Sequence, residues 1–200
     1  MKKTIGMILL LALMGGILSG CGDDKDADVS TLFVDKKGQI VEVSVGDFQK
    51  DNYDAEEFEQ YVKSTVEAYG GEGTVELSSV SVDDGTAKLK MEYSDSDAYA
   101  AFTGQELFAG TVVSAVAKGY DFNEEFTMVN EGTATDVASR DDVLGNDEYR
   151  VVILQMAEDV TVEGTIVYVS AGVTVKSEDT ATVKSLEHPG EVALRYIIYQ

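Results

Sequence analysis

The stretch Tyr149–Met156 reads YRVVILQM and is a nearly continuous run of apolar residues. A strand with one solvated face alternates apolar and polar side chains, whereas a strand covered on both faces does not. The run therefore predicts a central strand of a sheet. Further strand-like segments follow at short spacing, which favours a second half built mostly of antiparallel β structure: Thr161–Ser170, Val173–Lys176, Thr180–Lys184 and Glu191–Tyr199.

Two hairpins are predicted in the first half, because strand-like runs flank short turns with a late glycine. The first surrounds Asp35-Lys36-Lys37-Gly38 and the second surrounds Asp83-Asp84-Gly85. In the second hairpin the apolar phase shifts near Ser78-Ser79, which predicts a β-bulge there. The four strands are expected at Thr31–Val34, Gln39–Val45, Thr74–Val82 and Thr86–Tyr93.

One helix is predicted between the two hairpins. Asp54 is a favourable N-cap, and Glu57 three residues later completes the pattern of a capping box. Gly70-Gly71 marks the end of the helix. Apolar side chains recur on one face at helical spacing: Phe58, Tyr61, Val62, Val66 and Tyr69. The order of elements as far as Tyr93 is therefore ββαββ.

The middle of the chain gives shorter and weaker patterns. Capping residues and glycine stops predict two short helices, although β-branched residues make a strand the alternative for the second one. The expected segments are a helix capped by Ser96 that runs through Phe102 and is closed by Gly104, a strand at Gln105–Ala109, a helix over Val112–Lys118 capped by Thr111, a strand at Phe126–Asn130 and a polar irregular stretch at Gly132–Glu148.

These patterns predict an α+β fold with a ββαββ-like N-terminal half that carries short helices and a mostly antiparallel β C-terminal half. We expect residues 31–200 to form a single domain, which is long enough to bury a sizeable core. A boundary near residues 120–125 is the alternative, although no linker rich in Pro or Gly marks it.

The chain is strongly acidic, with a formal net charge of −22 at pH 7. Such a chain does not neutralise phosphates, so nucleic acid is excluded as a partner. Anionic lipid headgroups and anionic wall polymers would also repel it. Cations and basic protein patches are the partners that the charge would attract, and simple solubility is the alternative explanation of the acidity.

The N-terminus carries a signal-like segment. Lys2 and Lys3 precede an apolar run from Ile5 to Ile17, which is shorter than a comfortable bilayer span. The run ends in Leu18-Ser19-Gly20-Cys21, and Cys21 is the only cysteine in the chain. An ordinary secretory signal with an incidental cysteine, or a buried apolar helix, would be the alternatives.

Leu18-Ser19-Gly20-Cys21 resembles the lipobox of bacterial lipoproteins, and the chain looks like the small uncharacterised lipoproteins of Gram-positive bacteria. The resemblance implies that residues 1–20 are a lipoprotein signal peptide, removed by cleavage before Cys21. It further implies that Cys21 carries the lipid that anchors the protein to the outer side of the cell membrane. Two acyl chains are enough for stable anchoring in a bilayer. Residues 21–30 then read as an acidic tether.

The inventory of catalytic residues is poor. His188 is the only histidine and precedes Pro189-Gly190 in a predicted turn, and Cys21 is assigned to the lipid. Ser-His-Asp and Cys-His arrangements, zinc sites of the usual Cys/His kind and phosphate-binding glycine loops are therefore not expected. We expect no enzymatic activity and no cofactor.

Carboxylates are the one abundant chemical resource, and two groups of them are weak candidates for binding a hard cation. Asp95, Asp97 and Glu106 match the first, third and last ligand positions of an EF-hand loop, but Tyr99 and Ala100 depart from its pattern. The second group lies in the irregular stretch and consists of Asp141, Asp142 and Asp147 with Asn146 and Glu148. A helix N-terminus and a solvated loop are the respective structural alternatives.

Three functions follow in order of preference. The first is a non-enzymatic binding or interaction module displayed on the membrane by its lipid. The second is a lipoprotein that binds a small ligand or a divalent cation as an accessory to an envelope transporter. The third is a hydrolase of wall or glycan polymers that uses paired carboxylates. Tryptophan, a frequent platform for sugars, is absent, and core or cap packing explains Tyr53, Tyr61, Tyr69, Tyr93 and Tyr99.

Overall fold

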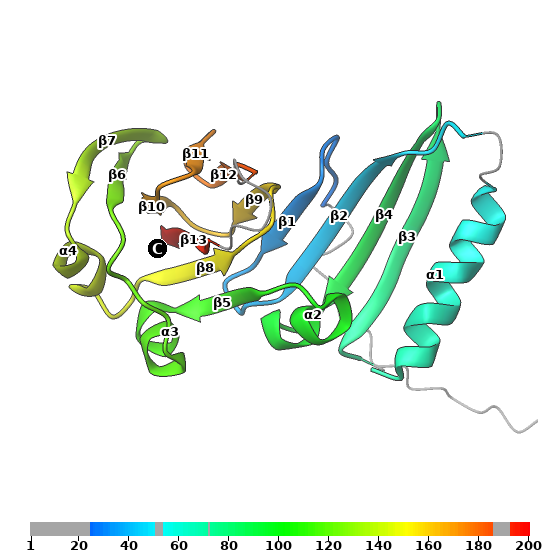
Figure 1. Cartoon of the computed structure of the whole chain (residues 1–200), viewed down its shortest axis with the longest axis horizontal. Coiled ribbons are helices and arrows are strands. Elements are labelled where there is room, and N and C mark those ends of the chain that lie inside the picture. The colour runs from blue at the N-terminus through cyan, green and yellow to red at the C-terminus, as the bar shows by residue number, and fades with distance from the viewer. Residues whose placement is uncertain (1–24, 51–53, 72, 186–192) are drawn as a thin grey trace, which may run out of the picture.

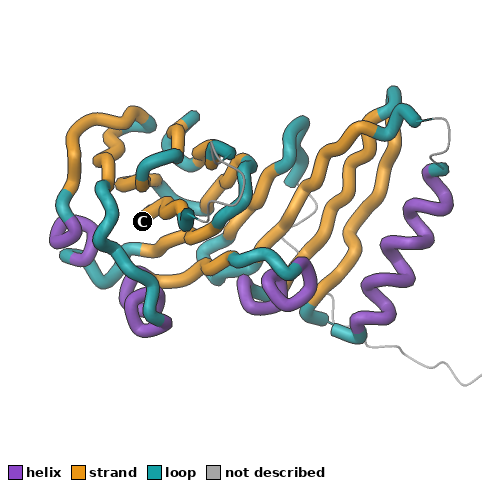
Figure 2. Tube along the Cα trace, viewed as in Figure 1, coloured by secondary structure: helices purple, strands orange, loops and turns teal. Residues whose placement is uncertain are grey.

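The computed structural model describes residues 25–50, 54–71, 73–185 and 193–200, and within them the predicted α+β class is confirmed. The chain forms two sheets (Figure 1), with the helices at their edges and outer surfaces (Figure 2). The first half follows the predicted ββαββ order as far as Tyr93. Among the helices of the described ranges, none is long and apolar enough to cross a bilayer.

Sheet A has seven strands and joins the two halves of the chain. Its centre is a parallel pair in which Thr31 lies opposite Asp159 and Leu32 lies opposite Val160, whereas all its other pairings are antiparallel. The strands, in spatial order, are β11 (Val173–Val175), β12 (Thr180–Val183), β9 (Asp159–Val162), β1 (Thr31–Val34), β2 (Ile40–Asp47), β4 (Thr86–Tyr93) and β3 (Val75–Asp83).

Sheet B has six strands and every pairing within it is antiparallel. In spatial order they are β5 (Leu107–Thr111), β8 (Arg150–Leu154), β13 (Arg195–Tyr199), β10 (Ile166–Ser170), β6 (Phe126–Asn130) and β7 (Thr133–Ala138). The prediction that residues 149–156 hold a central strand is confirmed, because β8 pairs with β5 on one side and with β13 on the other.

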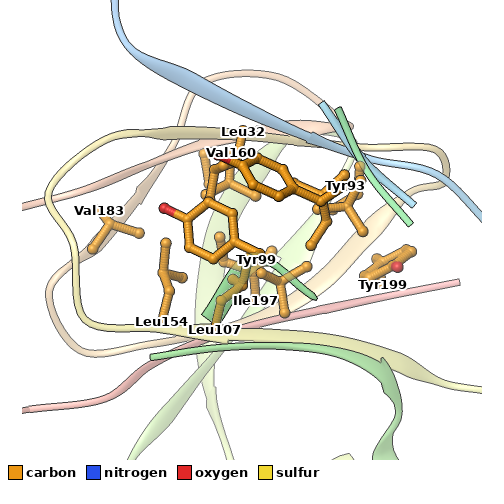
Figure 3. Packing of buried hydrophobic residues seen from close by; sticks show 14 of the residues in the cluster. Leu32, Tyr93, Tyr99, Leu107, Leu154, Val160, Val183, Ile197 and Tyr199 are labelled. Atoms are coloured by element: carbon orange, nitrogen blue, oxygen red, sulfur yellow. The ribbon is translucent and has the colours of Figure 1, made fainter. Parts of the chain in front are cut away.

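Both faces of sheet B are covered, which explains the unbroken apolar run. Val152 and Leu154 point into the core between the two sheets, which also receives Leu32, Val160 and Ile197 (Figure 3). Alternate residues of the same strands face a second core on the outer side of sheet B, beneath α3 (Val112–Lys118) and α4 (Arg140–Leu144): Val151, Ile153, Tyr196 and Ile198.

Local signals locate the first three helices correctly. Asp54 caps α1 (Ala55–Tyr69) by accepting the N–H groups of Glu56 and Glu57. The predicted cap of α2 (Ser96–Thr103) is wrong by one residue, because Asp95 and not Ser96 is the N-cap. Thr111 caps α3, so the helix and not the alternative strand forms over 112–118. The predicted bulge is also confirmed, because the β3–β4 register shifts between Leu77 and Ser79.

Two predictions about the second half are wrong. The stretch at 132–148 is not irregular: it holds β7, entered by a tight turn with positive φ at Glu131 and Gly132, and α4, which has a full capping box between Ser139 and Asp142. The expected single strand at 161–170 divides into β9 and β10, which belong to different sheets. Gly164 lies between them, where a Cβ atom would be 2.5 Å from the carbonyl oxygen of Gln200.

Helix α1 packs through a narrower face than its sequence predicts. Val62 is its only buried residue, and Phe58 and Val66 are half-buried against sheet A. Tyr61 is 69% exposed, so core packing does not account for it, whereas Tyr69 packs against Phe102 with ring centroids 5.2 Å apart. The helix therefore lies beside β3, the last strand of sheet A, and covers the inner face of that sheet only in part (Figure 1).

Residues 25–30 of the expected tether lie against the outer face of sheet A. Lys88 on β4 forms ion pairs with Asp26 and Asp28, at 3.4 and 3.0 Å. The Ser30 hydroxyl accepts the N–H of Val45 at 3.0 Å, which ties the segment to β2. Near the alternative boundary at 120–125, Phe122 is only 1% exposed and belongs to the core on the outer side of sheet B.

Candidate functional site

An open hollow of about 830 Å³ lies at one end of sheet B, and we call it the sheet-end hollow. Strand ends, the C-terminus of α3 and the segment that leads into β6 together form its walls. The lining residues are Glu106, Lys118, Gly119, Tyr120, Asp121, Asn123, Glu124, Gln155, Ala193, Leu194 and Tyr196.

Strand register brings together three of these residues that are far apart in the sequence. Leu107 on β5 lies opposite Leu154 on β8, and Leu154 lies opposite Arg195 on β13. Glu106, Gln155 and Leu194 are the neighbours of these three residues at the same end of the sheet. Successive side chains of a strand point to opposite faces of the sheet. Because Leu107, Leu154 and Arg195 face inward, Glu106, Gln155 and Leu194 face the side on which α3 lies. The Gln155 amide donates to Glu106 Oε2 at 3.0 Å.

The wall formed by residues 119–124 is held in place by aromatic packing. Gly119, with φ of +96°, ends α3 and turns the chain towards Tyr120. The Tyr196 hydroxyl donates to the carbonyl oxygen of Asp121 at 2.7 Å. Phe122 packs against Tyr196 with ring centroids 5.2 Å apart, and this contact anchors the segment in the outer core. Asp121 and Glu124 are thereby fixed at the rim.

The hollow is negatively charged. Glu106, Asp121 and Glu124 line it, and Lys118 is the one basic residue among its described lining residues. The Lys118 ammonium is already engaged, because it lies 2.8 Å from Asp97 Oδ1 and 5.4 Å from the centroid of the Phe108 ring. Acidic side chains therefore outnumber basic ones in the described lining, although the charge of Arg195 acts on Glu124 from nearby.

The surroundings of the hollow shift the pKa values of its titratable side chains. Burial and the nearby Glu106 carboxylate raise the pKa of the Tyr120 hydroxyl. Burial, followed by the charges of Glu124 and Asp121, raises the pKa of Tyr196 to about 12, so both phenols stay protonated at neutral pH. Partial burial also raises the pKa of Glu124, although the charge of Arg195 opposes this. The hollow therefore presents carboxylate and phenol oxygens beside an aromatic wall.

A second group of polar side chains lies inside the core where the two sheets meet. Glu42 on the inner face of β2 accepts hydrogen bonds from the Tyr93 hydroxyl at 2.8 Å and from the Ser44 hydroxyl at 3.1 Å. Glu158, just before β9, is close enough to Glu42 for their charges to interact. The rings of Tyr93 and Tyr99 lie side by side here among aliphatic side chains (Figure 3), with centroids 4.9 Å apart.

Glu158 is the unusual member of this group. Burial, together with the charges of Glu42 and Asp159, raises its pKa to about 8. Its Oε1 atom is buried without a hydrogen-bond partner in the part of the chain that the structure describes. Burial also raises the pKa values of Tyr93 and Tyr99. Because the group is enclosed by the core, we regard it as structural, and a neutral Glu158 as the form that the fold accommodates best.

The first predicted cation site does not assemble as a loop. Residues 96–103 form α2, so Asp95 serves as its N-cap and accepts the N–H of Ala98 at 2.8 Å. Asp97 instead pairs with Lys118, and Glu106 binds Gln155 in the hollow. The charges of Glu106 and Asp97 both help to raise the pKa of Tyr120.

The second predicted cation site is also rearranged. Asp142 completes the capping box of α4 by accepting the N–H of Ser139 at 2.8 Å, and the Ser139 hydroxyl also donates to it at 2.7 Å. The hydroxyl bond, followed by the backbone bond, lowers the pKa of Asp142. Asp141 lies in the first turn of α4, and Asp147 is exposed beyond that helix. Within the described residues, no group of three or more His, Cys, Asp or Glu side chains is arranged to hold a metal ion. Cys21 and His188 lie outside the described residues.

The sequence-based predictions missed most of the sheet-end hollow. The sequence patterns point to Glu106 but not to Asp121, Glu124 or Gln155, because only the pairing of β5, β8 and β13 brings these segments together. No known protein family, curated protein or solved structure matches this chain in comparisons with all three. The geometry of the hollow and the N-terminal sequence therefore carry the functional argument.

Proposed function

We propose that this protein is a non-enzymatic binding protein, anchored by lipid at Cys21 to the outer face of a bacterial membrane, whose sheet-end hollow takes a small cationic ligand. The observation that carries the proposal is the charge of the hollow: three carboxylates line it and its one lysine is already paired with Asp97. The lipobox-like Leu18–Cys21 supports the location.

The chemistry of the hollow favours an organic amine over a bare metal ion. Amine N–H groups can donate to the carboxylates of Glu106 and Glu124, while the Tyr120 ring offers a face on which a cation is stabilised. A bare divalent ion needs several oxygen ligands that converge closely, and among the residues that the structure describes no three His, Cys, Asp or Glu side chains are arranged to hold one. The ligand class is therefore an amine or quaternary ammonium compound of modest size.

The direct experiment is a thermal-shift and calorimetric titration of the purified full-length protein with spermidine, choline, calcium and a neutral disaccharide. We expect spermidine or choline to raise the melting temperature by several degrees, because a ligand that binds only the folded state stabilises it. Glu124→Gln should weaken binding by about threefold to tenfold through the loss of one charge contact.

The matched control is Glu125→Gln, which makes the same chemical change at the next residue, outside the lining of the hollow. Equal loss of affinity in the two variants would refute the assigned site. If neither spermidine nor choline raised the melting temperature, the assigned ligand class would be refuted.

The placement of Glu106 and Glu124 around one hollow favours glycan hydrolysis as the second candidate function, since paired carboxylates carry out that reaction. Release of reducing ends from wall glycan, abolished by Glu124→Gln but retained in Glu125→Gln, would establish the hydrolase in place of the binding protein.

The anchor is tested separately through Cys21→Ser. We expect the wild-type protein to fractionate with membranes and the variant to lose its lipid modification and tight membrane association, because stable anchoring needs the acyl chains. Metabolic labelling with a palmitate analogue reports the modification directly. A variant that remains processed and labelled would contradict the assignment of Cys21.

A further inference from the structure

A groove of about 580 Å³ lies between α1 and the inner face of sheet A, far from the sheet-end hollow, and we call it the helix groove. Ala87 and Leu89 on β4 form part of its floor, and Phe58 and Tyr61 on α1 form one wall. These side chains are apolar or aromatic. The groove exists because α1 buries only Val62 and leaves part of the sheet face uncovered.

The rim of the helix groove is acidic. Asp47 at the end of β2, together with Asp54 and Glu57 at the start of α1, lines it, and none of the lining residues that the structure describes is a lysine, arginine or histidine. The side chain of Tyr61 stands at the rim and is 69% exposed, which is unusual for a large aromatic residue next to an apolar surface. An apolar floor within a negative rim is complementary to a partner that is apolar on one side and basic on the other.

Charge decides between the candidate occupants. A second copy of this chain would bring another formal net charge of −22 towards the same acidic rim, and anionic lipid headgroups would be repelled in the same way. A basic amphipathic helix inserts apolar side chains at helical spacing and places lysine or arginine beside the rim carboxylates. We propose that the helix groove is the docking site for a basic amphipathic helical segment of a partner protein.

The groove offers a substitution that fills it without disturbing the fold. Gly46 is an exposed residue of β2 on the same face as Ser44, and it lines the groove. A Cβ atom built at Gly46 meets no heavy atom within 4 Å. Gly46→Leu therefore occludes the groove from the sheet side while leaving the core contacts in place.

The test uses the full-length protein and a fluorescent synthetic peptide in which leucines recur at helical spacing and the other positions are lysine. We expect saturable binding by fluorescence polarisation, weakened about tenfold by Gly46→Leu because the apolar contacts are blocked. Glu57→Lys should weaken binding about threefold. Glu56→Lys, at the neighbouring exposed position in the same helical turn but outside the groove lining, should have little effect.

Two further peptides complete the test. The same composition in scrambled order, without an apolar face, and the amphipathic peptide with glutamate in place of lysine should both bind at least about tenfold more weakly. Equal binding of the scrambled peptide, or equal loss in Glu56→Lys and Glu57→Lys, would overturn the proposal. The wild-type protein could instead form a dimer or bind anionic phosphatidylglycerol vesicles. If Gly46→Leu abolished either interaction, the groove would have another occupant and the proposal would be overturned.

Discussion

Sheet B and the α1 end of sheet A bury their strands to different extents. In β8 and β13 four of five residues are buried, because one face meets sheet A and the other meets α3 and α4. In β3 only Val75 is buried, and α1 covers the neighbouring surface through little more than Val62. The first region is therefore a stable scaffold, and the second leaves apolar surface available for contacts with other molecules.

The largest expected effect comes from the same substitution made in each region. Leu154→Ala removes a side chain that is fully buried between the sheets, and we expect it to lower the free energy of unfolding by about 3–5 kcal/mol. Leu89→Ala, on the half-buried floor of the helix groove, should cost about 1 kcal/mol, since less of its surface is removed from water. Urea denaturation of both variants measures the difference. Equal costs would mean that the groove is filled in solution.

A smaller and pH-dependent effect is expected at the junction between the regions. The folded pKa of Glu158, at about 8, lies above the value of an unfolded glutamate, so the folded state holds its proton more tightly. The protein therefore loses stability as the pH rises from about 4.5 towards 8. Glu158→Gln, which stays neutral, should raise the free energy of unfolding by about 1–3 kcal/mol at pH 9 and leave it nearly unchanged at pH 4.

The control for this prediction is Glu125→Gln, at an exposed position between α3 and β6. Its denaturation curves should follow those of the wild type at both pH values. A stabilisation by Glu158→Gln that is equal at pH 4 and pH 9 would show that packing, and not the proton on Glu158, is responsible.

Patterns confined to a few neighbouring residues predicted much of the fold. The Asp54 and Thr111 caps, the bulge beside Ser79 and the buried strand at 150–154 each have a signal within a short segment of sequence. The division of residues 161–170 between two sheets follows instead from distant pairings, of β9 with β1 and β12 and of β10 with β13 and β6. Local periodicity carries no information about such pairings.

The candidate site was less accessible to prediction for the same reason. Glu106 matches the last position of an EF-hand-like pattern, but its partner is Gln155, the residue directly after the neighbouring strand β8. Tyr196 lies within the strand expected at Glu191–Tyr199, yet its hydroxyl bond to the Asp121 carbonyl depends on tertiary packing. Acidic residues are so abundant in this chain that their identity alone does not distinguish the functional ones.

The parallel pairing of β1 with β9 has a consequence for the order in which the protein is made. β1 is the first strand that the structure describes, and its partner β9 begins only at Asp159, far along the chain. A chain that emerges N-terminus first can form the β1–β2 hairpin at once, but sheet A stays divided until β9 has emerged. Because closing such long loops slows folding, completion of this central pair is expected to be the late step, with the edge of β1 exposed to chaperones and proteases until then.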